Sequence, residues 1–399
     1  MRSNKITGFL LFLINPFLGG IKGFVDIRKQ DSLILIFGWF LVFGMGLSAL
    51  NELADSYSYV ENFELTKSME FFQYKSLIED YFSFNSNIKD IYTLSANFFI
   101  SRFTDNYHVL FLFYALVFGF FYLKSLKFFL RYQIKNNWVF YSLLFIFCFS
   151  NPIFNINGVR FWTAAWICVY STLSIIIDKK YWSLLLLAIT PLIHITALIW
   201  VLLIGIYFIT KRFQKIWVVI FVLSAFISAV SYLDILSSFA DSLPSVLQAM
   251  IQSYTESERA QEIMDGAKIP LYASILINMP GYFRLLLSFL LIFNLKKITR
   301  DKVSSNLFMA YLIVGSFVNF TAMIPSVGVR FQQLTIPLIV LVWTINHEHL
   351  SKYNDLFYLT PIFYAYSVMY WFRNVNSITQ FDLYIAPLPF TLVKYLLMS

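Results

Sequence analysis

The sequence predicts an all-α polytopic membrane protein, and three observations carry that prediction. Of the 399 residues, 59% are hydrophobic and only 13% are charged, with a mean hydropathy of +0.68. A soluble domain of this size needs a much larger charged surface. The apolar runs are continuous rather than alternating, which excludes the strand pattern of a β-barrel. Lys and Arg side chains gather in short segments between those runs, so we expect about 11–13 transmembrane or re-entrant helices.

The expected membrane spans are apolar segments of roughly 17–25 residues, the length needed to cross the hydrocarbon core of a bilayer. They lie at residues 33–50, 108–130, 138–152, 160–177, 216–234, 280–295, 304–324, 331–346, 354–372 and, with a weaker signal, 383–398. The N-terminal segment up to Gly20 predicts an uncleaved interfacial or re-entrant segment. Asn15-Pro16 interrupts its apolar run, and no cleavage site follows.

The stretch 181–209 predicts two short helices rather than one span. It is too long for a single crossing, and basic residues flank both of its ends. Pro191 and His194 lie near its middle, so we expect a break at 190–194. The pair then enters and returns on the same side. Broken helices at membrane depth are tolerated only where protein or a water-filled cavity surrounds them.

Charge predicts the orientation of the chain, because cytoplasmic loops collect Lys and Arg. The rule places four basic segments on the cytoplasmic side: 124–135, 179–180, 211–215 and 296–302. The opposite side then holds two longer acidic and aromatic segments, 51–107 and 235–279. No linker or low-complexity tract divides the chain, so we expect residues 1–399 to form a single integral membrane domain. The net charge of +8 is therefore an orientation signal and indicates no nucleic-acid partner.

A repeated tetrapeptide, Gly-Val-Arg-Phe, stands at 158–161 and again at 328–331. Each copy places an arginine, Arg160 or Arg330, at the start of an apolar segment on the outer side. Free N–H groups and the helix dipole favour anions there, and the guanidinium adds bidentate hydrogen bonds. These arginines predict a site for a phosphate-rich substrate. The competing interpretation is that each side chain simply extends to the membrane surface.

Other candidate catalytic residues are His194 and Asp55. His194 follows the expected break and predicts an acid/base group or a donor to phosphate or sugar; the alternative is a packing role. Asp55 lies just outside the first clear span and is the leading candidate for a general base. Tyr57 and Tyr59 follow it, and carboxylates and tyrosines there suit sugar hydroxyls. They also cap helices and form aromatic belts at membrane surfaces.

Further candidates for substrate binding are two more arginines. Arg284 lies a few residues inside an apolar run, where a charge usually faces a cavity or a partner. Arg373 is a weaker candidate on the outer side. No phosphate-binding loop, dinucleotide motif or metal-spaced His/Cys cluster is present, and His347-Glu348-His349 has poor ligand geometry, so no metal and no cofactor is expected.

Several of these segments together resemble a known family. Asn155-Ile-Asn157-Gly-Val-Arg160, Asp178-Lys-Lys180 and Pro191-Leu-Ile-His194 are similar to motifs of the EpsG-type bacterial polysaccharide polymerases, which are related to Wzy O-antigen polymerases. The likeness spans about residues 50–345, including Asp55 to Tyr59 and Arg330 to Pro337. Where the family often has Gln after the arginine, this chain has Phe161. Within the first motif, the resemblance adds Asn157 as a substrate-binding candidate.

The resemblance implies a GT-C-like fold and a glycosyl transfer on the outer face of the bacterial inner membrane. The substrate would be an oligosaccharide repeat unit on undecaprenyl diphosphate, joined into O-antigen, capsule or exopolysaccharide. Membrane lipid is the other expected partner, and a chain-length regulator is left open. Two alternatives remain: a lipid-linked oligosaccharide flippase or transporter, and a ligase-like transferase. Charges lining both membrane halves would favour a transporter, whereas the unusual charges here lie toward one side.

Overall fold

The computed structural model describes residues 2–29, 31–50, 52, 54–83, 90–226, 271–322, 324 and 327–397. These residues form helices and no β-strand; a single isolated bridge pairs Leu47 with Thr379. Within them, five helices are long and apolar enough to cross a membrane, and shorter apolar helices accompany those five. The prediction of an all-α polytopic membrane protein is confirmed.

The N-terminal helices pack beside the first long helix. These elements are α1 (Arg2–Ile14), α2 (Pro16–Val25), α3 (Ser32–Met45) and α7 (Tyr107–Leu130). The expected interruption at Asn15-Pro16 is present, since the Asn15 side chain accepts a hydrogen bond from Leu18 N at 2.9 Å and caps α2. Helices α3 and α7 touch so closely that a Cβ at Gly44 would lie 2.2 Å from Ala115 Cβ.

The middle of the chain contains the expected helix break. Its elements are α8 (Asn137–Phe149), the 3-10 helix η1 (Ile153–Gly158), α9 (Val159–Asp178), α10 (Ser183–Ile193), α11 (Ala197–Thr210) and α12 (Gln214–Ser224). His194 is extended, with φ −156° and ψ 119°, and separates α10 from α11. Both helices are tied to α9, through Ser183 Oγ to Ser174 Oγ and Trp200 Nε1 to Thr172 Oγ1, each 3.0 Å.

The C-terminal part contains three long helices and several short ones. Its elements are α16 (Leu271–Phe293), α17 (Leu295–Ile298), α18 (Lys302–Phe320), α19 (Val327–Ile345), η3 (Ser351–Leu359), α20 (Thr360–Val375), η4 (Phe381–Tyr384), α21 (Leu388–Leu392) and η5 (Val393–Leu397). The predicted spans 354–372 and 383–398 are thus each divided, the first between η3 and α20 and the second among η4, α21 and η5.

One helix begins earlier than the span predicted at 280–295. Residues 271–279 were expected in the outer segment 235–279, yet they form the first turns of α16. Pro280 lies inside that helix, where a proline removes one backbone hydrogen bond and here does not end the helix. The rest of that segment, 235–270, and residues 227–234 of the span expected at 216–234, lie outside the described residues.

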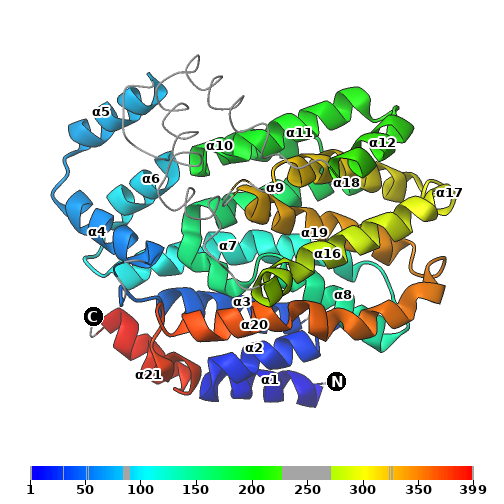
Figure 1. Cartoon of the computed structure of the whole chain (residues 1–399). Coiled ribbons are helices and arrows are strands. Elements are labelled where there is room, and N and C mark those ends of the chain that lie inside the picture. The colour runs from blue at the N-terminus through cyan, green and yellow to red at the C-terminus, as the bar shows by residue number, and fades with distance from the viewer. Residues whose placement is uncertain are drawn as a thin grey trace.

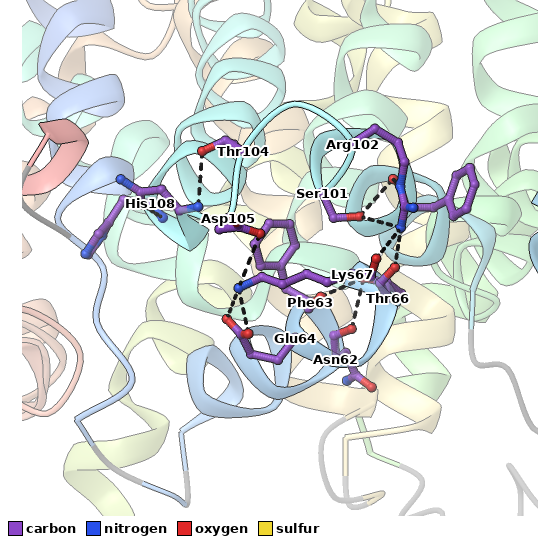
Figure 2. Close-up of polar contacts among 12 residues, drawn as sticks. Asn62, Phe63, Glu64, Thr66, Lys67, Ser101, Arg102, Thr104, Asp105 and His108 are labelled. Carbon is purple, nitrogen blue, oxygen red and sulfur yellow. Dashed lines mark hydrogen bonds and ion pairs between the residues drawn. The ribbon is translucent and has the colours of Figure 1, made fainter. Parts of the chain in front are cut away.

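The described part of the outer segment 51–107 folds into α4 (Asp55–Lys67), α5 (Phe71–Phe82) and α6 (Ile91–Ile100). Figure 2 shows how α4 is held: Arg102, just beyond α6, donates to Thr66 O at 2.5 Å and Lys67 O at 3.0 Å. These bonds satisfy carbonyl groups at the C-terminus of α4, where a cation also complements the helix dipole. Lys67 in turn pairs with Glu64 at 2.6 Å.

Two ends of the molecule can be told apart in Figure 1. Helices α4, α5 and α6 gather at one end of the long helices, and α17 with its lysines lies at the other. We name these the α4 end and the basic end; the latter is defined by the turns at 131–136, 179–182, 211–213 and 294–301. Because the helices run back and forth, the starts of α9 and α19 belong to the α4 end.

Candidate functional site

Arg160 is in the first turn of α9 and contacts Tyr59 in α4 and Asp90, the residue that caps α6. Its Nη1 donates to Asp90 Oδ2 at 3.3 Å, and its Nε donates to the Tyr59 hydroxyl at 3.4 Å. The Asp90 side chain is 2% exposed, whereas that of Arg160 is 26% exposed. The guanidinium is therefore anchored on one side by a buried carboxylate and keeps a partly open side. No described residue accepts a hydrogen bond from its Nη2.

Asp90 is a site residue that sequence reasoning missed. Its Oδ1 caps α6 by accepting hydrogen bonds from Thr93 N and Thr93 Oγ1, both at 2.7 Å, which leaves Oδ2 for Arg160. Burial raises the pKa of the Asp90 carboxyl, against the lowering effects of the Thr93 bonds and the Arg160 charge. The available signal was an aspartate directly before an apolar helical run, which is an N-cap pattern.

Tyr59 completes the support of Arg160. Its ring is 6% exposed and packs edge-on against Tyr114, with 6.0 Å between ring centroids. Burial raises the pKa of the Tyr59 hydroxyl to about 12, although the nearby Arg160 charge acts in the other direction. The hydroxyl therefore stays protonated at neutral pH. It accepts a hydrogen bond from Arg160 as a neutral group and adds no charge to the site.

The two Gly-Val-Arg-Phe tetrapeptides meet in space. The Arg330 guanidinium carbon lies 5.2 Å from the centroid of the Phe161 ring, and the Phe331 ring contacts the same ring at 6.0 Å. Arg330 is in the first turns of α19, and no described carboxylate pairs with it. At Gly328 an added Cβ would lie 2.5 Å from Thr321 O, so this glycine permits a close approach of the backbone.

His194 contacts Phe161 as well. The two rings meet edge to face at 5.3 Å, and His194 is close enough to Arg160 and Arg330 for both charges to act on it. Its Nδ1 lies 2.6 Å from Thr196 Oγ1 and accepts from Thr196 N at 3.3 Å. An accepting Nδ1 leaves the proton of a neutral imidazole on Nε2. Arg330 and His194 thus contact the Phe161 ring, and Arg160 precedes Phe161 in the chain; we call these four residues the Phe161 cluster.

Asp55 and its neighbours border this cluster. An added Cβ at Gly158 would lie 3.5 Å from Asp55 Oδ2, so the carboxylate of Asp55 sits beside the start of α9. The Asn157 side chain accepts a hydrogen bond from Ser56 N at 3.0 Å and joins η1 to the first turn of α4. Tyr57 is 37% exposed. The structure therefore brings Asp55 and Asn157 next to Arg160, and their catalytic and binding roles stay predictions.

The two remaining arginine candidates lie in other surroundings. Arg284 is 4% exposed and donates to the Tyr311 hydroxyl at 3.2 Å and to Asn319 Oδ1 at 2.6 Å. Its partners in the described residues are neutral and come from α18. Arg373 is exposed in the last turn of α20. No contact joins either of them to the Phe161 cluster within the described residues, and their substrate-binding roles stay predictions.

The described residues contain no group of three or more His, Cys, Asp or Glu side chains that could hold a metal ion. A family model, described as the EpsG family, matches residues 32–388. The chain belongs to the EpsG family. The match takes in every residue of the Phe161 cluster, together with Asp55 and Asp90. Membership of the EpsG family supports a role in polysaccharide biosynthesis as a glycosyltransferase-like polymerase of the membrane.

No curated protein and no solved structure matches the chain. The GT-C-like architecture of this EpsG-family chain therefore stays a prediction.

Proposed function

We propose that this chain joins undecaprenyl-diphosphate-linked oligosaccharide repeat units into O-antigen, capsule or exopolysaccharide on the outer face of the inner membrane. The observation that carries the proposal is the contact between two separate helix starts: the Arg330 guanidinium lies over the ring of Phe161, the residue that follows Arg160. Among the described residues these two arginines form one ion pair, that of Arg160 with Asp90, and two guanidinium groups with so little compensation suit a ligand with two phosphates.

The reaction breaks the bond between the anomeric carbon of the growing chain and the oxygen of its lipid diphosphate. An acceptor hydroxyl of the incoming unit forms the new glycosidic bond, and the diphosphate leaves with the electron pair. Negative charge therefore develops on the leaving group, where Arg160 and Arg330 would stabilise it. Positioned donors of this kind are worth about 10²–10³ in rate each. Nη2 of Arg160 is unengaged among the described residues and is the natural donor.

The acceptor hydroxyl must lose a proton, and Asp55 is the proposed base. Asp90 is unsuited because Arg160 and Thr93 already occupy its oxygens. Asp55 is exposed beside Gly158, and no described cation lies within ion-pair distance of it. His194 contributes a second group able to donate from Nε2. Tyr57, Tyr59, Asn157, Arg284 and Arg373 remain the proposed contacts to sugar or lipid, and the scheme uses no metal and no cofactor.

The test is a gel of surface polysaccharide from a strain deleted for this gene and complemented with plasmid-borne variants. We expect Arg160→Ala to lower long-chain polymer at least about a hundredfold, since it removes a leaving-group contact. Arg160→Lys should recover little, because an ammonium lacks the planar fork of donors. Arg212→Ala is the matched control, since Arg212 is exposed at the basic end. Comparable membrane levels of all variants exclude a folding defect.

Each alternative predicts a different pattern in the same strains. A wild-type ladder from Arg160→Ala would remove the leaving-group role. A flippase would instead lose even the single-unit product while lipid-linked units accumulate inside the cell. A ligase-like transferase would leave a lipid-linked polymer that is made but never transferred.

A further inference from the structure

A pocket of about 480 Å³ opens at the basic end, far from the Phe161 cluster. The turn between α2 and α3 forms one wall, and the end of α7 with the turn into α8 forms the other. Its floor is apolar: Ile27, Ile134 and Phe140 are each 2% exposed. This pocket is independent of the proposed polymerase chemistry. Helix α7 runs from the α4 end to the pocket, and its 24 residues correspond to about 36 Å of helix.

The side chains that line this pocket are strongly basic. Five are cationic and none is anionic: Arg28, Lys29, Lys127, Arg131 and Lys135. Two of the five are neutralised from outside the pocket, Lys29 by Asp26 at 2.9 Å and Arg131 by Asp178 through a bidentate pair. The other three have no carboxylate partner among the described residues. A concave, apolar-floored pocket with three such cations is suited to an anion.

Arg28 is held in a fixed position at the wall of the pocket by several contacts. Its Nη2 donates to Ile134 O at 2.9 Å, and its Nη1 donates to Asn137 Oδ1 at 3.2 Å. Its guanidinium carbon also lies 4.0 Å above the Phe140 ring. One side chain thus fastens the α2–α3 turn to the α7–α8 turn. Hydrogen bonds and ring contact fix its charge at the pocket wall without a carboxylate to cancel it.

We propose that this pocket binds the phosphate-bearing headgroup of an anionic phospholipid from the leaflet at the basic end. A free phosphate would need only the cations, whereas a lipid also needs apolar surface for its acyl chains. That surface is present beside the pocket: Val25 is 56% exposed, Ile34 is 71% exposed and Trp138 is 42% exposed. Basic pockets between helices on the cytoplasmic side are suited to anionic headgroups.

Among the described residues, the space between α3 and α7 offers this pocket no route to the opposite end. Between α3 and α7 the interior is filled by aromatic and aliphatic side chains, among them Phe40 at 1%, Phe118 at 0% and Leu126 at 0% exposure. Interiors packed in this way leave no passage for a headgroup. A bound lipid would therefore stay where it binds and stabilise the turns, rather than being carried across the membrane.

The experiment measures lipid retention by the purified, full-length protein in native mass spectrometry. The probes are phosphatidylglycerol and phosphatidylcholine at equal concentration, with inorganic phosphate in a third arm. The variant Lys127→Gln/Lys135→Gln removes two exposed cations that form no hydrogen bond or ion pair with the described residues. Lys211→Gln/Lys215→Gln is the matched control, since both lysines are exposed at the basic end outside the pocket.

We expect wild type to prefer phosphatidylglycerol, and the pocket variant to bind it about ten- to thirty-fold more weakly. The control variant should bind as wild type does, and equal elution profiles should show that both variants fold. Three outcomes would overturn the proposal. The first is that wild type binds phosphatidylglycerol no better than phosphatidylcholine. The second is that the control variant binds phosphatidylglycerol as weakly as the pocket variant does. The third is that inorganic phosphate displaces the lipid at micromolar concentration. Loss of transbilayer movement of a lipid-linked substrate in the pocket variant alone would indicate a transport site instead.

Discussion

Asp90 and Arg160 form an ion pair whose two partners are buried to different degrees. Asp90 is enclosed, and burial raises the pKa of its carboxyl even with Arg160 and Thr93 beside it. Keeping this carboxylate ionised therefore costs folding free energy instead of supplying it. Groups held at such a cost gather at functional sites. The geometry gives a reason: the carboxylate fixes Arg160 Nη1 and leaves the rest of the guanidinium for a ligand.

We predict that Asp90→Asn lowers polymer synthesis without lowering the thermal stability of the protein. Asparagine still accepts from Thr93 N through Oδ1 and caps α6, while its NH2 group replaces the charged oxygen that accepts from Arg160. Polymer synthesis should fall about ten- to a hundredfold as Arg160 loses its anchor. Thermal stability in detergent should stay equal or rise. Asp90→Ala, which also removes the cap, should lose about 1 kcal/mol of stability. Full activity in Asp90→Asn would show that Arg160 needs no anchor.

The raised pKa of Asp90 also sets the sign of a pH effect. Because the folded state binds this proton more tightly than the unfolded chain, the contribution of Asp90 to the free energy of unfolding falls as pH rises from about 4 to the raised pKa. Asparagine does not titrate. The melting temperature of wild type relative to Asp90→Asn should therefore fall across that window. A relative melting temperature that rises with pH would contradict the assignment.

At the scale of elements, the site depends on two helix starts that are far apart in sequence. The first turns of α9 and α19 present Phe161 and Phe331 to each other, and the break between α10 and α11 brings His194 to the same ring. The Phe161 ring also lies against the Arg330 guanidinium, 5.2 Å from its carbon atom. The aromatic ring is a platform that orients a cation without neutralising it.

Phe161→Leu tests this platform, and Phe331→Leu is its matched control. Both phenylalanines are almost fully buried, at 6% and 1% exposure, so both changes should cost about 1–2 kcal/mol of stability. Of these two rings, Phe161 has a guanidinium over it in the described structure and Phe331 does not. We therefore expect polymer yield, normalised to protein in the membrane, to fall about tenfold in Phe161→Leu and to stay near wild type in Phe331→Leu. Equal losses in both would reduce Phe161 to a packing residue.

Sequence alone predicted the positions of the helices better than the side-chain contacts between them. Hydropathy located the long helices, and Pro191 with His194 located the break, because both are local properties of the chain. The sequence did not predict Asp90 as a site residue, because its place in the site depends on its contact with Arg160, which is 70 residues away in the sequence. The start of α16 was missed because a proline usually marks a helix boundary, whereas this helix continues through Pro280.

At the scale of the whole molecule, charge is divided between the two ends. The basic end carries the lysine-rich turns and the proposed lipid pocket, while the α4 end carries Asp55, Asp90 and the Phe161 cluster. The positive-inside rule then predicts that the basic end faces the cytoplasm. This orientation is required by the proposed function, because repeat units would be joined on the outer face only if the Phe161 cluster faces outward.

Single-cysteine labelling decides the orientation. Cys148 and Cys168 are first replaced by Ala, and one cysteine is then placed at Asp105 or at Lys297. Asp105 is 89% exposed near the α4 end, and Lys297 is exposed at the basic end. In intact spheroplasts a membrane-impermeant maleimide should label Asp105→Cys almost completely and Lys297→Cys only at background. Permeabilisation should make both react, since both side chains are accessible once the membrane barrier is gone. The reverse pattern would place the Phe161 cluster in the cytoplasm, where an outer-face polymerase cannot work.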